Sequence, residues 1–211
     1  MSTKTLWTKA RRYVLASSLG LLLPLGLNGC QTALESGPLI TDQSYWQGMQ
    51  ERLQQIKSVQ LRGNVSIAYK SDRFSTNFVY RSTAPGTYSL LLVSSLGSQL
   101  ADLKVTPEAA VLIADNHTFT AQSPQELFAQ VTKIPLPLDD FQSIIIGKAL
   151  PSSTFTSNGI LRTTTLPDFQ VAYNDYLSLP ESQLSLPKEI EVLGPNLRLV
   201  VKTRAVEKLE L

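Results

Sequence analysis

VQLRGNVSIAYKSDRFSTNFVY, from Val59 to Tyr80, alternates apolar and polar side chains over two segments that Ser71-Asp72 separates. A period of two residues is typical of a β-strand with one buried face, because successive side chains point to opposite faces. Serine followed by aspartate favours a tight turn. The stretch therefore predicts an antiparallel hairpin of two long strands with one apolar face: Val59, Leu61, Gly63, Val65, Ile67 and Tyr69, then Phe74, Thr76, Phe78 and Tyr80.

The same alternation recurs later in the chain, over residues 101–105, 169–173 and 197–201. Turn-forming residues separate these runs at short intervals, which favours antiparallel hairpins and predicts about ten strands. A sheet of that size must curl, and its apolar face must be covered. Further turns are expected at Pro85-Gly86, Thr106-Pro107, Asp115-Asn116, Asn158-Gly159, Pro167-Asp168 and Gly194-Pro195-Asn196.

Three short amphipathic helices are predicted, and they supply that cover. The first begins with capping-box spacing at residues 44–47, and the second begins at Ser123 with Pro124 in its first turn. The third follows the run at residues 134–138 and ends at Gly147. The predicted fold class is mostly β with α: a single curved antiparallel sheet, an open half-barrel, covered by short helices. The pattern alone leaves open whether they enclose a hydrophobic cavity or a solid core.

The first thirty residues resemble the signal of a bacterial lipoprotein. Basic residues at positions 4, 9, 11 and 12 precede an apolar run over 13–27, which is too short and too interrupted for a comfortable membrane span. The run ends in Leu27-Asn28-Gly29-Cys30, which is similar to a lipobox whose cysteine becomes acylated. Cys30 is the only cysteine in the sequence and so has no disulfide partner. An ordinary signal peptide with a chance cysteine is the alternative.

This reading divides the chain into a lipoprotein signal peptide (1–29), a lipid anchor with a flexible tether (30–43) and one domain (44–211). The formal net charge of the whole chain is +2, but four of its 19 basic residues lie in the signal. Their removal leaves 15 basic against 17 acidic residues, a net charge of −2. We therefore expect no binding to nucleic acid.

The residues that common catalytic and metal sites need are missing. His117, the only histidine, follows a predicted turn and is expected in solvent. With one histidine and an acylated cysteine, no conventional zinc or Cys–His site can form. The sequence holds no G-x-S-x-G elbow, P-loop or Rossmann glycine pattern, and a helix start explains Asp139-Asp140. The sequence predicts a binding protein and not an enzyme.

Residues from Trp46 to Lys202 resemble the LolB family of outer-membrane lipoprotein receptors. The resemblance lies in the order of several short motifs, in register with the lipobox. They are Trp46 in the first helix, Arg62-Gly63 in the first strand, Leu90-Leu91-Leu92 leading to Leu96-Gly97, Ile134-Pro135-Leu136-Pro137-Leu138 before the last helix, and Leu186-Pro187 followed by Ile190.

The resemblance implies a receptor held by acylated Cys30 on the periplasmic face of the outer membrane. Such a receptor accepts acylated lipoproteins from the periplasmic carrier LolA, holds the acyl chains in a hydrophobic cavity, and releases them among the membrane phospholipids. No cofactor is implied, and we expect a monomer. The alternation in the strands and the helix patterns predict which residues bind the acyl chains. At residues 90–92 three leucines run together, so the alternation does not show which of them face inward. The predicted acyl-binding residues are Val65, Ile67, Phe74, Phe78, Tyr80, Leu90, Leu92, Phe128, Ile134, Phe141 and Ile145.

LLVSSLGSQLADLKV, from Leu91 to Val105, predicts a hairpin with Leu96 at its tip. Turn tips face water and are usually polar or glycine, so a leucine there is unusual. One interpretation is that Leu96 folds back onto its own sheet. The resemblance implies the other interpretation, in which Leu96, beside Gly97, protrudes and inserts into the bilayer during cargo release.

Two other functions remain open. The same scaffold could carry another lipid or apolar molecule, or a lipoprotein with a solid core could serve as a structural subunit of a membrane-assembly complex. A filled interior would favour the structural subunit. A cavity that holds phospholipid but has no affinity for acylated protein would favour the other lipid carrier.

Overall fold

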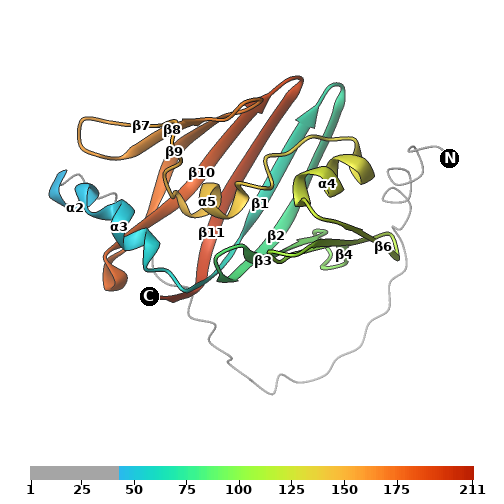
Figure 1. The fold of residues 1–211 in the computed structure, drawn as a ribbon, viewed down its shortest axis with the longest axis horizontal. Coiled ribbons are helices and arrows are strands. Elements are labelled where there is room, and N and C mark those ends of the chain that lie inside the picture. The colour runs from blue at the N-terminus through green and yellow to red at the C-terminus, as the bar shows by residue number, and fades with distance from the viewer. Residues whose placement is uncertain (1–42) are drawn as a thin grey trace, which may run out of the picture. The chain divides into compact units, whose positions relative to one another are not determined.

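The computed structural model describes residues 43–211, which fold around one antiparallel sheet (Figure 1). The predicted signal peptide, Cys30 and nearly all of the predicted tether lie outside the described residues. Within them the sheet has eleven strands in the order β6-β5-β4-β3-β2-β1-β11-β10-β9-β8-β7. The strands are β1 (Ser58–Tyr69), β2 (Asp72–Ala84), β3 (Thr87–Val93), β4 (Gln99–Val105), β5 (Ala110–Ala114), β6 (His117–Ala121), β7 (Ser153–Phe155), β8 (Leu161–Thr165), β9 (Gln170–Leu179), β10 (Leu184–Gly194) and β11 (Leu197–Glu210).

Strand β1 lies at the centre of the sheet, between β2 and the last strand, β11. The register sets Ser58 opposite Glu210 and Tyr69 opposite Leu197, so the first and last strands pair over the whole length of β1. The pairing shifts by one residue next to Gly63, where β11 approaches closely. The alternation in the sequence is confirmed, since the apolar positions of β1 and β2 share one buried face.

Each predicted turn lies at a junction between consecutive strands. Asp115 and Asn116 both have positive φ, which suits the tight hairpin between β5 and β6. The eleven strands agree with the predicted count of about ten, and the short strand β7 ends the sheet beyond β8.

Short helices lie over the apolar face, as Figure 1 shows for α5 in front of the central strands. The side chain of Ser123 accepts a hydrogen bond from the backbone N–H of Glu126, and Pro124 is the first helical residue, as the sequence predicts. Gly147 ends α5 with a φ of +75°. The helices are α2 (Gln43–Gln47), α3 (Met49–Gln54), α4 (Pro124–Thr132) and α5 (Phe141–Ile146), with one 3-10 turn, η2 (Pro180–Ser182).

The first predicted helix is wrong in two details. It is broken at Gly48 into α2 and α3, because Gly48 takes up the cap position of the second piece. Ser44 lies inside α2 and does not cap it, since Gln43 is already helical. Trp46, Met49 and Leu53 still face the core, because the break keeps their spacing on one side.

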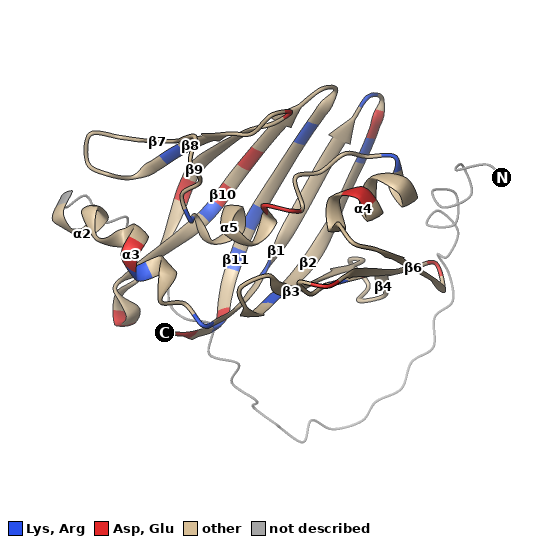
Figure 2. Ribbon diagram, viewed as in Figure 1, with Lys and Arg blue, Asp and Glu red and all other residues tan. Residues whose placement is uncertain are grey.

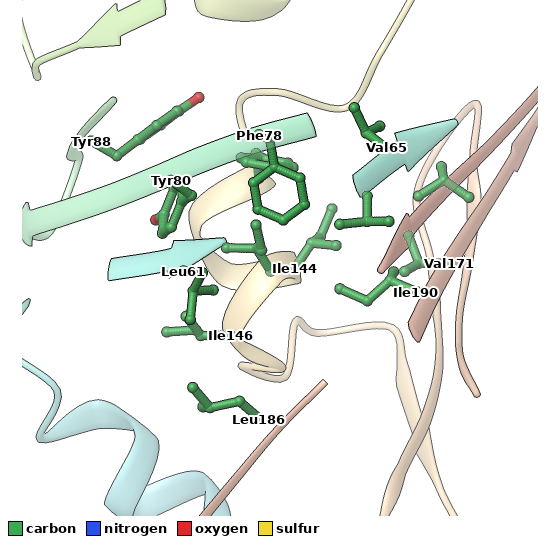
Figure 3. Close-up of a cluster of buried hydrophobic side chains, with 14 of the residues drawn as sticks. Leu61, Val65, Phe78, Tyr80, Tyr88, Ile144, Ile146, Val171, Leu186 and Ile190 are labelled. Atoms are coloured by element: carbon green, nitrogen blue, oxygen red, sulfur yellow. The ribbon is translucent and has the colours of Figure 1, made fainter. Parts of the chain in front are cut away.

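The core lies between the helices and the apolar face of the sheet. Figure 3 shows Leu61 and Phe78 of the sheet beside Ile144 and Ile146 of α5. No helix among the described residues is both long enough and apolar enough to cross a membrane. The buried core of the described residues is built from segments that follow Gln43.

Candidate functional site

An apolar cavity lies between the sheet and the segment that joins α4 to α5. Strands β1, β2, β3 and β11 form its floor, and α4, residues 136–138 and α5 form its roof. The cavity has a volume of about 40 Å³. An apolar cavity of this kind stays dry and favours apolar ligands. The lining residues are Val65, Ile67, Phe78, Leu90, Leu92, Phe128, Leu136, Pro137, Leu138, Phe141, Leu199 and Val201.

Helix α5 is tied to the sheet by hydrogen bonds. The side-chain nitrogen of Gln142 donates to the Ser82 hydroxyl at 2.6 Å and to the Ala84 carbonyl at 2.8 Å. Its side-chain oxygen accepts from the backbone N–H of Gly86 at 2.7 Å. These three bonds fix α5 to the β2–β3 hairpin.

The α4 side of the roof is tied differently. Asp139 accepts a hydrogen bond from the Ser123 hydroxyl at 2.9 Å, which joins the two ends of the α4 segment to each other. Between Lys133 and Pro137, the described structure has no hydrogen bond from this segment to the sheet. Apolar contact alone therefore holds this part of the roof over the cavity.

An aromatic cluster surrounds Phe141, the cavity-lining residue of α5. The ring of Tyr80 lies 5.7 Å from that of Phe141 and 5.8 Å from that of Tyr88, measured between centroids. Burial raises the pKa of the Tyr80 and Tyr88 hydroxyls above the ordinary tyrosine value. Both side chains are neutral at physiological pH, and burial extends the neutral range to higher pH.

The structure brings seven of the eleven predicted acyl-binding residues to the cavity. Leu90 and Leu92 point into the cavity and Leu91 faces away from it. The sequence alone did not show which of these three leucines face inward. The seven are Val65, Ile67, Phe78, Leu90, Leu92, Phe128 and Phe141.

The other four predicted residues do not line the cavity. Tyr80 and Ile145 are fully buried in the core. Phe74 and Ile134 are partly buried and pack against the core. The alternation in β2 correctly places Phe74 and Tyr80 on its apolar face. Residues on that face still differ in whether they border the cavity, because the helices cover different parts of the strand.

Five lining residues were not predicted, although their sequence signals were present. Leu199 and Val201 belong to a recognised alternating strand. Leu136, Pro137 and Leu138 belong to the Pro-Leu run that the family resemblance uses. Reading that run as part of the roof would have found them.

Leu96 is 91% exposed at the tip of the β3–β4 hairpin, so it does not pack on its own sheet. The turn beneath it is ordered by hydrogen bonds from the backbone N–H of Ser94 to the Ser98 carbonyl at 2.8 Å and from that of Gly97 to the Ser94 carbonyl at 3.0 Å. Gly97 has a φ of +84°, which glycine adopts without strain. A hydrogen-bonded turn therefore holds the Leu96 side chain exposed to solvent.

No group of three or more His, Cys, Asp or Glu residues in the described range is arranged to hold a metal ion. His117 is exposed, and its Nδ1 lies 2.8 Å from the Asp115 carbonyl oxygen. It is the first residue of β6, directly after the Asp115-Asn116 turn, and it is exposed to solvent as the sequence predicts.

The sequence profile described as "Outer membrane lipoprotein LolB" matches residues 57–203, more than half of the chain. Three similar curated proteins are each named outer-membrane lipoprotein LolB. The protein from Yersinia pestis is 30% identical over 86% of this chain and 92% of its own length. That from Yersinia enterocolitica is 28% identical over 84% and 91%, and that from Pectobacterium carotovorum is 29% identical over 74% and 78%.

Among solved structures, a LolA superfamily protein from Nitrosomonas europaea aligns over 82% of this chain and 96% of its own, with 10% identity and a TM-score of 0.47. The profile match and the relatives establish the relationship by sequence. This chain belongs to the LolB family of outer-membrane lipoproteins.

Proposed function

We propose that this protein is an outer-membrane lipoprotein receptor that accepts acylated lipoproteins from the carrier LolA and inserts them into the inner leaflet of the outer membrane. Acylated Cys30 anchors it on the periplasmic face, and it acts as a monomer by binding alone, without catalysis or cofactor. One observation carries the proposal: an apolar cavity whose roof is tied to the sheet on its α5 side and rests on the sheet by apolar contact on its α4 side.

The cavity is too small for an acyl chain and must widen to hold cargo. A volume of about 40 Å³ has room for about three water-sized groups, whereas an acyl chain has about fifteen carbons. The α4 side of the roof is the part that moves in this proposal, because no hydrogen bond to the sheet must break. Helix α5 stays in place through Gln142 and keeps the far wall intact.

Acyl chains cannot cross water unshielded. Each exposed methylene costs about 0.8 kcal/mol, so one chain of about fifteen carbons costs on the order of 12 kcal/mol. Cargo must therefore pass directly from the carrier's shielded site to this cavity. A receptor that binds acyl chains more tightly than the carrier, and less tightly than the bilayer, gives the transfer its direction.

Release needs contact between the domain and the bilayer. The lipid anchor keeps the domain near the membrane and raises its effective concentration there. Leu96 then enters the bilayer and orients the domain. Burial of one leucine stabilises by about 1.5–3 kcal/mol, which is too little to anchor a protein and enough to bias its orientation.

Cargo transfer between soluble components tests the proposal. Residues 31–211 of this chain contain all of the described core and lack Cys30, so they can be mixed with LolA that carries a labelled lipoprotein. We expect the label to move to this protein. A label that stays on the carrier contradicts the receptor function.

A pair of neighbouring substitutions localises cargo to the cavity. Leu92 lines the cavity and Leu91 faces the opposite side of β3, so the same tryptophan can be placed on either face. Leu92→Trp should lower the affinity for acylated cargo about tenfold, a loss of about 1.4 kcal/mol, and Leu91→Trp should leave it unchanged. Equal effects of the two substitutions would remove the cavity from the binding step.

The wholly apolar lining also fits any other acyl lipid, which keeps one alternative function. Phospholipid bound in the cavity, together with no uptake of acylated protein, would support a carrier of another lipid. Uptake of neither would leave a structural lipoprotein with a nearly filled core.

A further inference from the structure

A hollow of about 320 Å³ lies over strand β1, and six of its eight lining residues belong to the face of the sheet opposite the cavity. It is open to solvent and lies two residues from the β1–β2 turn. Its lining residues are Ser66, Ile67, Ala68, Arg73, Phe74, Ser75, Arg198 and Val200.

Strand register places two arginines on either side of one alanine. Ala68 of β1 is paired with Arg73 of β2 and, on its other side, with Arg198 of β11. Neighbouring strands are about 4.8 Å apart, so the two arginines start about 10 Å apart with only a methyl group between them. In the next row, the hydroxyls of Ser66 and Ser75 lie 3.0 Å from each other and add hydrogen-bonding groups to the floor.

The two guanidinium groups keep donors free. Arg73 has no hydrogen bond or ion pair to any described residue. Arg198 binds Glu191 through Nε alone, at 2.5 Å, which leaves its two terminal nitrogens without a partner in the described structure. On the same face Arg62 is likewise bonded through Nε, to Glu207, and Lys202 is paired with Glu189. Arg73 and Arg198 differ from these cations in lining one hollow together.

We propose that this hollow binds the phosphate of a phospholipid headgroup, with Arg73 and Arg198 as its two clamps. A guanidinium presents a planar fork of N–H donors that matches two phosphate oxygens, and two such forks on either side of a small residue leave space for one phosphate. The serine hydroxyls can donate to a third oxygen. The site is distinct from the apolar cavity, because its arginines and serines lie on the other face of the sheet, although Ile67 lines both.

The hollow lies at the end of the sheet that also carries Leu96. The β1–β2, β3–β4 and β10–β11 turns all lie at this end, since the antiparallel register pairs Tyr69 with both Asp72 and Leu197 and pairs Val93 with Asn77. Figure 2 shows basic positions on β2 and β11 near this end. The inference rests on the proposed function, which brings this domain to a bilayer, and it assigns a second, polar contact to that encounter.

A titration with a soluble phospholipid, followed by nuclear magnetic resonance, tests where the headgroup binds. Dihexanoyl phosphatidylglycerol, below its micelle concentration, is titrated into residues 31–211, and the backbone amides of Ser66, Ala68 and Ser75 are followed. We expect saturable shifts at these amides. Shifts confined to the apolar cavity, or none at all, would overturn the assignment.

Vesicle binding with a matched pair of variants tests the arginines. Arg204 is also exposed on the outer face of β11 and outside the hollow, so Arg204→Gln makes the same charge change as Arg73→Gln. On mixed phosphatidylethanolamine and phosphatidylglycerol vesicles, Arg73→Gln should weaken binding about fivefold, the factor for about 1 kcal/mol per arginine near an anionic surface. Arg204→Gln should weaken it less than twofold. Equal losses would mean that only diffuse charge acts, and would overturn the site.

Two further outcomes also decide the proposal. Saturation of the same amides by inorganic phosphate with no response to lipid would assign the hollow to a soluble anion and overturn the headgroup assignment. Protection of the hollow by LolA with no response to lipid would make it a carrier-docking surface, which also overturns it. Neither titration contains cargo, so this inference can fail while cargo transfer succeeds, and the reverse.

Discussion

The hydroxyl of Tyr88 donates a 2.8 Å hydrogen bond to the carbonyl oxygen of Leu138, and so joins strand β3 to the roof of the cavity. Leu138 is the last cavity-lining residue before α5 begins at Phe141. The bond therefore lies where the roof segment held by apolar contact meets the helix held by hydrogen bonds. It marks the point about which the α4 side of the roof would turn.

Removal of this hydroxyl should loosen the roof. Tyr88→Phe leaves a buried carbonyl without its donor, which costs about 1–3 kcal/mol of stability. Uptake of a fluorescent fatty acid should become faster, because the roof opens more often. Urea unfolding and stopped-flow fluorescence measure the two effects.

Tyr176→Phe is the matched control. The Tyr176 hydroxyl is also buried and donates to the Leu161 carbonyl at 2.6 Å, on β8 and away from the roof. It should lose similar stability and keep the wild-type uptake rate. Equal uptake rates in the two variants would show that the Tyr88 bond does not control opening.

Four buried tyrosines predict a loss of stability at alkaline pH. Burial raises the pKa of Tyr173 to about 12 and also raises those of Tyr80, Tyr88 and Tyr176. In the unfolded chain these groups lose their protons near pH 10, while the folded protein retains them. The stability that these neutral tyrosines give to the folded state is therefore complete below about pH 10. The free energy of unfolding falls as the pH rises above that value.

Urea unfolding at a series of pH values measures this fall, with tyrosinate absorbance as a second readout. We expect the absorbance to rise together with unfolding. A free energy of unfolding that stays constant well above pH 10, as in a protein with exposed tyrosines, would contradict the prediction.

The strands and turns could be predicted from the sequence because each depends on local chemistry. The alternation at residues 59–80 gives one buried face, and pairs such as Asp115-Asn116 accept the positive φ that a tight hairpin needs. Gly147 ends α5 for the same local reason. The break at Gly48 was missed, because the apolar spacing of Trp46 and Met49 continues across it.

The cavity was only partly predictable, because its walls depend on which helix covers which part of the sheet. Phe78 and Tyr80 are alternate residues on one face of β2, yet Phe78 lines the cavity and Tyr80 lies in the core beside it. The covering ring of Phe141 makes that difference, and it comes from a residue about sixty positions later in the chain. No periodicity in β2 carries that information.

Any substitution of Gly63 in β1 should destabilise the fold, because a side chain there has no room. A methyl group there would overlap the carbonyl oxygen of Lys202 and would lie 2.7 Å from the Phe78 ring. Because a carbonyl in a paired strand cannot easily move, Gly63→Ala should cost about 3 kcal/mol. Chemical unfolding measures the loss.

Gly97→Ala provides the comparison, since its cost has a different origin. No heavy atom lies within 4 Å of an added methyl group there, but φ is +84°. Backbone strain alone should cost about 1–2 kcal/mol. A larger loss at Gly97 than at Gly63 would mean that the close approach of β1 and β11 relaxes without penalty.

Leu96→Glu should separate cargo acceptance from cargo delivery. The side chain is 91% exposed and touches no core residue, so the variant should fold within about 0.5 kcal/mol of the wild type. It should still take cargo from the carrier, because the cavity lies elsewhere. It should fail to deliver the cargo into liposomes, because a carboxylate at the hairpin tip cannot enter the bilayer. Ser95→Glu adds the same charge at the neighbouring exposed position and keeps the leucine, so it should retain most delivery. Normal delivery by Leu96→Glu would remove the insertion role, and equal failure of both variants would attribute the defect to charge at the tip and not to loss of the leucine.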